Sequence, residues 1–520
     1  MSRSTRRNRQ RNAQNKEQKA SGFPQLERTT LRNRFAPIQA LDPEQIETIH
    51  NASMTILEDL GIEVVGDMAL DLFRNAGAEV DDNGLVRMGR EMVMEYVGKA
   101  PSTFTITPRN PDNVLFSGEN VINFGLVSGP PNVHDEINGR RMGNIADYKK
   151  LIQLGQHFNV ISFFGNQATA PTDLPANSRH LDTTLINLIE SDKAFFAQGI
   201  GAGRALDAAK MSAIARGISL KEMVHSPSAM TNINVNSPRK LDDSMAYGAM
   251  QMALLGQAVT VTPFTLMGAM APLTLGGALA QQNAEALFGI VLMQLTRSGA
   301  PVVYGGFTSN VDMRSGSPAF GTPENSLANM AGGQLARHYN LPHRTSACNA
   351  SNAVDSQATY ETQMSLWGST LGHGNLIYHA AGWLEGGLVA SFEKIVTDCE
   401  MLQHMSYLMK PITINLEEIG IDAIKQVGPG GHFFGCDHTM ARYKEAFYQP
   451  FLSDWQNFEN WEMNGSKNST QRATEIWQKI LAEFEPPAID PAIQEELEAY
   501  VAKRKEELGS HEPVLEPVEI

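Results

Sequence analysis

The chain has 520 residues, of which 42% are hydrophobic, so it can bury at least one large core. Its formal net charge of −15 would repel a phosphate backbone over most of the surface, which argues against nucleic acid as a partner. Three cysteines are too few for a disulfide framework, and no apolar run reaches the roughly 18 to 20 residues of a membrane helix. We therefore expect a soluble, cytoplasmic protein with no membrane partner.

The pattern of the N-terminal part of the chain predicts two segments. Five arginines lie among polar residues in positions 1–11 with no apolar segment after them, so neither a secretory nor a twin-arginine signal is complete. We expect a disordered basic arm over residues 1–30, with an electrostatic contact to an acidic partner as the alternative. Residues 31–115 begin with helical patterns at Pro43–Leu60 and Met68–Ala76 and continue as short extended runs, which predicts a small α/β lead-in.

After the lead-in, apolar β-rich runs alternate with helix-length segments. The eight candidate strands are Val121–Gly125, Val160–Gly165, Ala194–Ile200, Ala229–Val235, Ala258–Phe264, Pro301–Phe307, Arg344–Ala347 and Leu376–Ala380. Strand, crossover helix and parallel strand, repeated eight times, is the sequence form of a closed (β/α)8 barrel. The fold class we expect is therefore α/β, with a TIM-barrel catalytic domain over residues 116–392.

An open doubly wound sheet is the alternative topology, and it usually carries a glycine fingerprint after its first strand. The glycines of Gly199–Gly203 follow the third strand instead, so a tight turn explains them better. Beyond the barrel, amphipathic stretches at Thr470–Phe484 and Ala492–Leu508 predict a C-terminal helical extension over residues 393–508. We expect the Pro/Glu-rich tail, residues 509–520, to be disordered.

Catalytic groups of such barrels lie at the carboxyl ends of the strands and in the loops that follow them. Those windows are rich in amides, hydroxyls and glycines and nearly lack Lys and Arg, so a phosphorylated substrate is a poor fit. A cation fits better, because aromatic faces and carboxylates hold quaternary ammonium groups. The candidate aromatic residues are Phe264, Phe307, Tyr378 and Trp383, and the candidate carboxylates are Asp312, Asp355 and Glu385.

The aromatic candidates differ in how well packing alone would explain them. Phe307 and Tyr378 alternate with aliphatic residues inside their strands, which is equally the pattern of core residues. Trp383 lies in a glycine-flanked loop, where a large ring has less structural reason to be.

The polar candidates also have more than one interpretation. Asn232 and Asn234 share one parity on strand four, so they face the lumen either as substrate contacts or as a buried polar layer. His379, at the end of strand eight, is a general base, a residue that orients substrate, or a hydrogen-bonded barrel histidine. Cys436 and His438 lack the spacing of a zinc site, so we expect no metal and interpret them as part of a structural loop.

Several segments together resemble one family, the trimethylamine:corrinoid methyltransferases and their non-pyrrolysine relatives, which include glycine betaine:corrinoid methyltransferases. The likeness runs in family order over roughly Arg32 to Leu481. Its segments are Met270–Leu275, Ala280–Glu285, Gly305–Asp312, Asn349–Asp355, Ala380–Leu388 and Val427–Phe433. The resemblance implies a corrinoid-dependent amine methyltransferase whose barrel mouth accepts the amine and docks a separate corrinoid-binding protein. The cobalamin is then presented by that partner and not held by this chain.

Some members of the family insert pyrrolysine, whose imine captures a tertiary amine, whereas this chain has only standard residues. We place the equivalent position in or near Ala347–Asn349. A quaternary ammonium is already activated for displacement, so the favoured substrates are betaines such as glycine betaine, carnitine or proline betaine. Trimethylamine or another N-methyl amine is the alternative substrate, and a non-catalytic betaine-binding barrel is the alternative of another class.

The resemblance implies a single displacement in which the pocket orients an N-methyl group toward the reduced corrinoid of the partner. Proximity and exclusion of water would supply the rate, because no acid or base is needed when the amine leaves neutral. The expected substrate-binding residues are Asn234, Phe264, Phe307, Tyr378 and Trp383, and the expected catalytic residues are His379, Asp312 and Glu385. Within this scheme Asp312 or Glu385 balances charge, while His379 and Asn234 orient the carboxylate. We also expect a homo-oligomer built through the outer helices.

Overall fold

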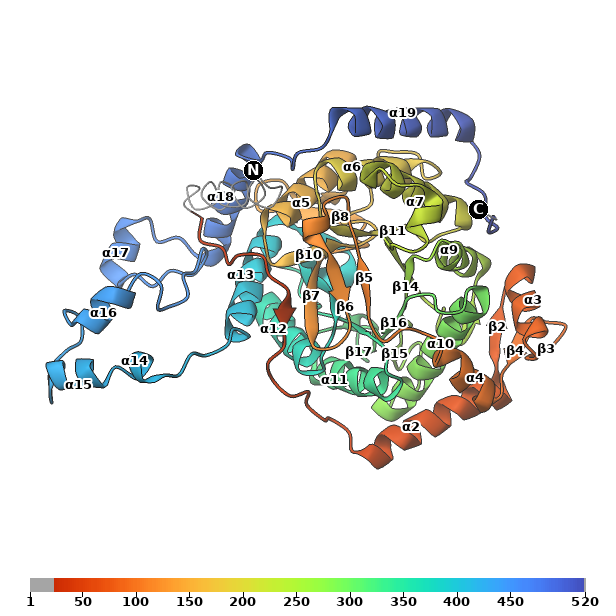
Figure 1. Cartoon of the computed structure of the whole chain (residues 1–520), viewed down its shortest axis with the longest axis horizontal. Helices are drawn as coiled ribbons and strands as arrows, with labels where there is room; N and C mark the ends of the chain where they lie inside the picture. The colour runs from red at the N-terminus through yellow and green to blue at the C-terminus, as the bar shows by residue number, and fades with distance from the viewer. Residues whose placement is uncertain (1–22, 519–520) are drawn as a thin grey trace, which may run out of the picture.

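Eight parallel strands close into a barrel in the computed structural model, which describes residues 23–518 (Figure 1). In barrel order the strands are β7 (Val121–Leu126), β10 (Ile161–Phe164), β11 (Ala194–Ala197), β12 (Met230–Ile233), β14 (Ala258–Val261), β16 (Val302–Gly305), β19 (His343–Ser346) and β20 (Leu376–Ala381). Pairing of β20 with β7 closes the ring. The TIM barrel expected from the eight apolar runs is confirmed, and the open sheet is excluded.

One helix follows each strand and packs on the outside of the barrel. These are α5 (Ile145–His157), α6 (Arg179–Ile189), α7 (Ala202–Arg216), α9 (Asp243–Leu254), α10 (Leu275–Thr296), α11 (Pro323–His338), α12 (Ser356–Leu371) and α13 (Phe392–Leu408). A short α8 (Leu220–Met223) precedes β12. Side chains accept hydrogen bonds from the first turns of several helices, among them Asn144, Asp242 and Thr322, so these helices start where the sequence supplies a cap.

The N-terminal segment forms a small layer over α10 (Figure 1). It contains α2 (Pro43–Thr55), a π-turn (Ile56–Leu60), α3 (Asp67–Asn75), α4 (Arg90–Val97) and a sheet ordered β13 (Lys240–Leu241), β2 (Ile62–Val64), β4 (Leu85–Arg87), β3 (Glu79–Val80). Phe73 stacks on Phe288 of α10 at 4.7 Å, and Ser53 donates to the Ala280 carbonyl. This layer explains why α10 is buried on both faces from Ala278 to Gln294, including polar residues such as Gln282 and Glu285.

A hairpin closes the amino-terminal end of the barrel. Strands β5 (Phe104–Ile106) and β6 (Leu115–Ser117) pair antiparallel, and Ile106 and Leu115 pack against residues of the barrel interior. Strand β1 (Leu31–Arg32) pairs antiparallel with β7 on the outside. The boundaries expected near residues 115 and 392 stay predictions, since β2 pairs with β13, which lies inside the barrel segment.

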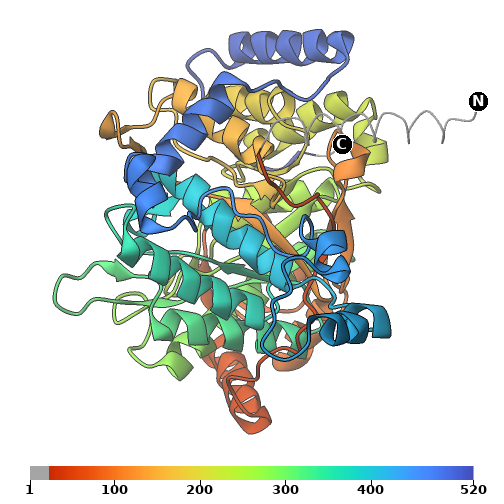
Figure 2. The same ribbon diagram turned by 90° about the vertical axis from the view of Figure 1, so that its left-hand side faces the viewer.

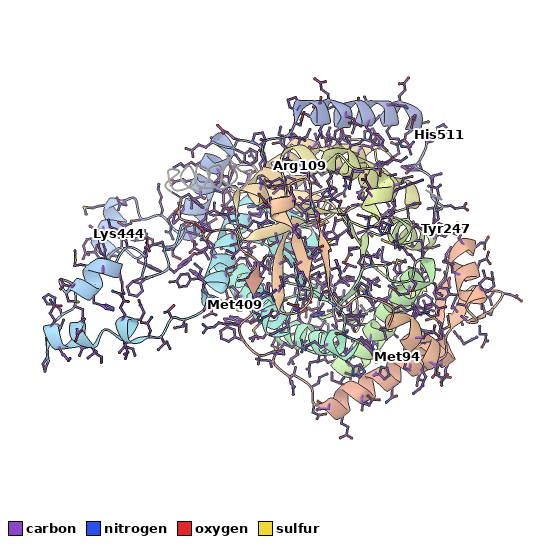
Figure 3. All side chains as sticks on the ribbon, viewed as in Figure 1. Met94, Arg109, Tyr247, Met409, Lys444 and His511 are labelled. Atoms are coloured by element: carbon purple, nitrogen blue, oxygen red, sulfur yellow. The ribbon has the colours of Figure 1, made fainter. Side chains whose placement is uncertain are left out.

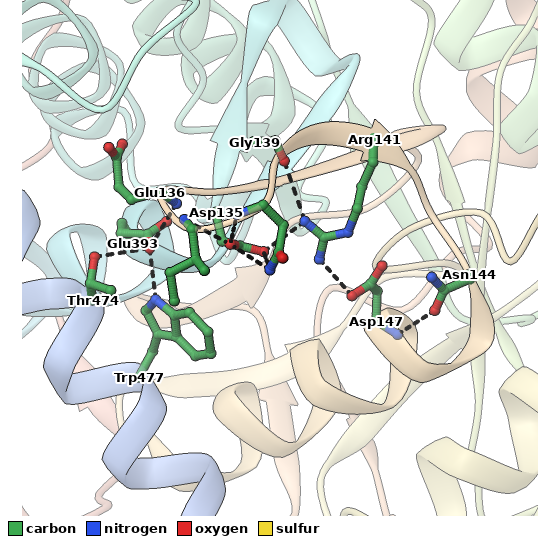
Figure 4. Close-up of polar contacts among 11 residues, drawn as sticks. Asp135, Glu136, Gly139, Arg141, Asn144, Asp147, Glu393, Thr474 and Trp477 are labelled. Carbon is green, nitrogen blue, oxygen red and sulfur yellow. Dashed lines mark hydrogen bonds and ion pairs between the residues drawn. The ribbon is translucent and has the colours of Figure 1, made fainter.

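The C-terminal segment is helical. After α13 come α14 (Leu416–Ile419), α15 (Ile421–Val427), α16 (Asp437–Arg442) and α17 (Phe458–Met463), which stand off the barrel, then α18 (Ser469–Ala482) and α19 (Pro491–Leu508) (Figures 1 and 2). Trp477 of α18 stacks near Phe392 at 5.1 Å and donates its Nε1 to Glu393 at 2.7 Å (Figure 4). Helix α19 packs across α6 and α7. These contacts hold the extension against the barrel.

The two ends of the described chain are bound to the barrel. Residues 23–30, expected to belong to a disordered arm, run against α5 and α13, where the Leu26 amide donates to Gln403 Oε1 at 2.7 Å. The rest of that expected arm up to residue 22 lies outside the described residues. The tail expected to be disordered follows a defined path to residue 518, with the Ala202 and Gly203 amides donating to the carbonyls of Leu515 and Val514. No helix in residues 23–518 has the length and apolar character to cross a membrane.

Candidate active site

The carboxyl end of the barrel is rimmed by two small sheets. One is formed by β15 (Leu266–Met267), β17 (Ser309–Val311) and β18 (Pro318–Ala319), which follow the fifth and sixth barrel strands. The other joins β21 (Trp383–Leu384) and β22 (Val389–Ser391) to the hairpin β8 (Asn132–Asp135) and β9 (Gly139–Met142). Arg141 of that hairpin binds Asp135 and Asp147 at 2.6 and 2.8 Å, which fixes it to α5 (Figure 4). Strand pairing and these ion pairs therefore hold the rim in a defined position.

Arg344 is the unexpected residue at this end of the barrel. It belongs to β19 and is only 2% exposed, with its guanidinium carbon 4.3 Å from the centre of the Tyr378 ring and 5.2 Å from that of Phe307. Its Nη1 donates to the Gly306 carbonyl at 3.1 Å, while its buried Nε has no partner. Within residues 23–518, no carboxylate forms an ion pair with it. Burial lowers the pKa of Arg344 to about 10, so the group stays charged at neutral pH.

His379 lies next to this arginine in a strained backbone conformation. Its φ is 56°, which turns strand β20 at its carboxyl end and is rare for a residue with a side chain. Its Nε2 lies 3.4 Å from Arg344 Nη2. Because a guanidinium only donates, Nε2 accepts, and the proton of the neutral ring is on Nδ1. Burial, with the neighbouring Arg344 charge second, holds the pKa of His379 well below its usual value, and the buried Nδ1 has no partner.

An aromatic cluster surrounds His379. Its ring centroid is 4.1 Å from that of Trp383 and 5.8 Å from that of Phe307. Phe307 in turn lies 5.0 Å from Phe264 and 5.1 Å from Phe320. Phe264 and Phe307 are partly exposed, whereas Phe320 and Trp383 are buried. The loops after strands five, six and eight thus bring these rings to one place, next to the buried guanidinium.

Tyr378 does not belong to this cluster of loop aromatics. It is buried in the barrel interior, with its ring 5.1 Å from Phe163 and 4.8 Å from Phe196. Its side chain therefore packs in the core and presents a face to Arg344. The core interpretation, which the alternation in its strand had left open, describes its surroundings better than a substrate contact.

Local contacts fix the position of Trp383. Its Nε1 donates to the Asn349 carbonyl at 3.1 Å, and the Asn349 amide side chain donates back to the Trp383 carbonyl, so the loops after strands seven and eight are joined. Gly387 has a φ of 103°, and a Cβ there would come within 2.5 Å of the indole ring. A glycine is therefore required beside the ring. The segment Ala347–Asn349, our expected equivalent of the pyrrolysine position, is fully buried here.

Asn234 is partly exposed just past strand β12, on the same side as Asn232. The Asn232 amide lies 3.4 Å from Asn234 Oδ1, and Thr262 Oγ1 donates to Asn232 Oδ1 at 2.9 Å. The shared parity inferred from the sequence places both side chains together. Because neither is fully buried, they line the open end of the barrel and do not form a sealed polar layer.

Two of the three candidate carboxylates, Asp312 and Glu385, lie outside the aromatic cluster, and the third, Asp355, caps the start of α12, where its Oδ1 accepts from the Ala358 amide at 3.1 Å. Asp312 is exposed in the turn between β17 and β18, where it accepts from Ser315 Oγ at 2.7 Å and from two backbone amides. Glu385 has its charge matched by Arg140, whose Nε lies 3.0 Å away. Among the described contacts, neither carboxylate approaches Arg344 or the rings, so both behave as residues that hold their loops. No three metal-ligating side chains gather in residues 23–518, and Cys436 contacts Thr439.

A family model described as trimethylamine methyltransferase (MTTB) matches residues 3–509, nearly the whole chain. The chain belongs to the trimethylamine methyltransferase (MTTB) family. This confirms the resemblance seen in the sequence segments and places the chain among methyltransferases.

Three members of the family are similar to this chain over most of its length. Glycine betaine methyltransferase of Desulfitobacterium hafniense is 36% identical over 472 residues, covering 90% of this chain and 98% of that protein. Trimethylamine methyltransferase MttB of the same species is 29% identical over 472 residues, covering 90% and 94%. Proline betaine:corrinoid methyltransferase of Eubacterium limosum is 28% identical over 412 residues, covering 78% and 84%.

Two residues of this site, Arg344 and Phe320, were not predicted from the sequence. Arg344 is the first residue of the expected strand seven, at the opposite end of the strand from the carboxyl end where site groups are expected. A long side chain on a barrel strand can reach the carboxyl end, so a charged residue within an apolar strand was the available signal. Phe320 follows β18 in a long loop, and no local pattern indicated that it would fold back on Phe307.

Proposed function

We propose that this family member transfers a methyl group from a quaternary amine that carries a carboxylate to the cobalt of a corrinoid bound to a partner protein. The observation that carries the proposal is Arg344, a buried guanidinium at the carboxyl end of the barrel that pairs with no carboxylate of residues 23–518. An uncompensated buried charge is costly, and it is tolerated where a ligand of opposite charge completes the site. A betaine carboxylate has that charge.

The neighbouring groups fit the rest of a betaine. The partnerless Nε of Arg344 and Nδ1–H of His379 are both donors, so they can hold the carboxylate. The ammonium then lies toward Phe264, Phe307 and Trp383, whose rings offer the electron-rich faces that bind methylated ammonium groups. In this arrangement His379 is a neutral hydrogen-bond donor that positions substrate, and it is not a general base.

The transfer itself requires little chemistry from this chain. The C–N bond to the methyl group breaks, its electron pair stays on nitrogen, and the amine leaves neutral, so no proton has to move. The corrinoid of the partner is the methyl acceptor and supplies a strong nucleophile. The chain's own residues orient the N-methyl group toward the open end of the barrel, and the rings of Phe307 and Trp383 exclude water there.

Charge balance in this scheme comes from the substrate and not from the protein. Asp312 and Glu385, which the sequence suggested for that role, bind Ser315 and Arg140 respectively. Asn234 remains a substrate contact in the proposal, since its partly exposed amide lies past strand four at the same end of the barrel.

The same electrostatics argue against the simplest alternative substrate. Trimethylamine is protonated at neutral pH and would bring a second positive charge toward Arg344 with nothing to compensate it. A non-catalytic betaine-binding barrel would have the same pocket, but the relatives similar to this chain are named as methyltransferases.

The test is a panel of methyl donors mixed with the purified protein and a corrinoid protein shown to accept methyl groups. Glycine betaine, proline betaine and carnitine carry the carboxylate, whereas choline and trimethylamine do not. We expect the cob(I)alamin absorbance to convert to that of methylcobalamin only with carboxylate-bearing donors. Saturable betaine binding without conversion would support the binding barrel, and conversion with trimethylamine alone would refute the proposal.

A further inference from the structure

A closed ring of hydrogen bonds lies behind Trp383 and joins the loops after strands seven and eight to helices α12 and α13. Trp383 and Asn349 bind each other, and the Asn349 side-chain amide also donates to Thr362 Oγ1 of α12 at 3.1 Å. The Thr362 hydroxyl accepts a second hydrogen bond from Lys394 Nζ of α13 at 2.9 Å. Lys394 in turn pairs with Asp398, one turn later on the same helix.

Asp398 completes the ring at the backbone of the loop after strand eight. Its Oδ2 accepts from the Gly382 amide at 2.9 Å, directly before Trp383 in the chain. Gly382 has a φ of 95°, and a Cβ there would come within 2.6 Å of the Ile395 side chain, so the loop passes close against α13. The carboxylate therefore fixes the backbone where it turns from His379 toward the indole.

The ion pair in this ring is fully enclosed. The side chains of Lys394 and Asp398 are 0% and 1% exposed, on the buried part of α13 that packs on β20. Figure 3 marks the end of this helix at Met409. Burial raises the pKa of Asp398, and the Lys394 charge acts in the opposite direction.

Stability alone does not explain a pair in this position. Taking two charges out of water costs about as much free energy as their attraction returns, and well-packed apolar side chains of similar volume often stabilise a fold equally well. The contacts of the pair are directional, however, because each charge holds a polar group that leads to the same ring. The contacts therefore indicate a role in geometry.

Two groups of the proposed substrate site lie on the loop that the pair holds. Trp383 offers a ring to the ammonium, and His379, whose ring centroid is 4.1 Å from that of the indole, offers a donor to the carboxylate. Both polar contacts of the Trp383 residue, at its Nε1 and at its carbonyl, are made by Asn349. Whatever holds Asn349 therefore also holds the ring, and a ring that turns away loses its cation–π contact.

We propose that Lys394 and Asp398 are positioning residues that set the orientation of the Trp383 ring for a methylated ammonium substrate. The lysine acts on the ring through α12 and the loop after strand seven, and the aspartate acts through the backbone that precedes the ring. The role of the ring toward substrate rests on the proposed function, whereas its fixed orientation does not.

The test replaces the ion pair by an apolar pair, Lys394→Met with Asp398→Leu, in the full-length chain. No charge is then buried alone, so the double variant should still unfold cooperatively in urea. With glycine betaine and a competent corrinoid protein, we expect KM to rise about 2- to 30-fold, which is the range of a lost cation–π contact. Betaine binding, measured by calorimetry, should weaken in parallel.

Lys193→Met is the matched control. This lysine is also buried, but it donates to the carbonyls of Gly155 and Phe158 at 2.8 Å each, and it precedes β11 at the amino-terminal end of the barrel. The control should lower stability without changing KM for the betaine.

A measurement without substrate separates this inference from the proposed function. The chain has five tryptophans, and labelling with 5-fluorotryptophan gives fluorine NMR signals, of which Trp383→Phe identifies the one from Trp383. We expect one narrow Trp383 signal in the wild type and in Lys193→Met, and a shifted, broadened or split signal in the double variant. Thr362→Val, which breaks the path from the lysine to Asn349 and leaves the ion pair in place, should change the same signal if the double variant does not fold.

An unchanged Trp383 signal in these variants would overturn the proposal, and so would a changed signal with the wild-type KM. If the wild type transfers no methyl group from any betaine while the signal still changes in the variants, the proposed function fails and the positioning of the ring stands.

Discussion

Replacing Arg344 by Gln is the most direct perturbation of the proposed site. The change removes the positive charge next to His379 while keeping a side chain that can still donate to the Gly306 carbonyl. Arg344→Gln should therefore weaken carboxylate binding without preventing folding. The free protein should unfold at an equal or higher urea concentration than the wild type, because a buried charge without a counter-ion is removed.

The size of the catalytic effect follows from the contacts that are lost. A hydrogen bond to a charged group contributes about 1.5–3 kcal/mol, and Nε is the nitrogen of the Arg344 guanidinium that is left without a partner. A loss of about 1.5–3 kcal/mol corresponds to a fall in kcat/KM of about 10- to 150-fold. The assay is methylcobalamin formation from glycine betaine with a competent corrinoid protein. Binding of the betaine, measured by calorimetry, should weaken in parallel.

Arg337→Gln is the matched control, since Arg337 donates to the Gly372 carbonyl from α11 and takes no part in the cluster. It should leave kcat/KM for the betaine within about twofold of the wild type, as expected for a change away from the reacting groups. Wild-type kcat/KM in Arg344→Gln would refute the reasoning. A fall in kcat/KM without weaker binding of the betaine would refute it as well, because the arginine would then act on the fold of the site and not on the carboxylate.

Three further predictions concern folding and local geometry. Burial lowers the pKa of His343 to about 3, so the unfolded chain binds more protons at this residue below pH 6.5. His343 alone should therefore contribute about 2 kcal/mol to the loss of stability from pH 7.5 to pH 5. In urea unfolding His343→Gln should reduce the total loss by that amount, and an unchanged loss would count against the prediction. Gly387→Ala should raise KM for the betaine by displacing the neighbouring indole of Trp383. In the control Gly386→Ala the added Cβ would meet nothing closer than 3.7 Å, so only the stability should fall. Equal KM values for the two variants would contradict this prediction. Lys394→Met should destabilise the protein by about 3–5 kcal/mol, because Asp398 stays buried without its partner. Adding Asp398→Leu should restore part of that stability. A double variant no more stable than Lys394→Met would contradict the pairing.

The architecture could be predicted because it rests on local patterns. Each barrel strand is a short apolar run between turn residues, and several helices begin at a capping side chain such as Asn144 or Thr322. The shared parity of Asn232 and Asn234 also came from the strand repeat alone, and the structure places the two side chains together. The family followed from whole segments that keep their order along the chain.

The composition of the site depended on contacts that no local pattern encodes. Arg344 and His379 lie 35 residues apart on neighbouring strands, and their meeting depends on the barrel closing and on the positive φ of His379. Tyr378, one residue earlier, points into the core because adjacent strand residues face opposite sides. Asp312 looked equally suitable in sequence, but its hairpin turn takes it to the surface.

By itself, then, the sequence determined a barrel of eight strands with helices around it, a helical C-terminal segment and membership of a methyltransferase family. These follow from periodicity and segment order, which are properties of neighbouring residues. Only the tertiary structure decided that the Arg344 guanidinium lies next to an aromatic cluster, that Asp312 and Glu385 are engaged elsewhere, and that the segment from residue 411 to residue 447 exposes apolar side chains. The reason is physical: burial and charge compensation depend on which distant side chains meet, and that is fixed only when the barrel closes.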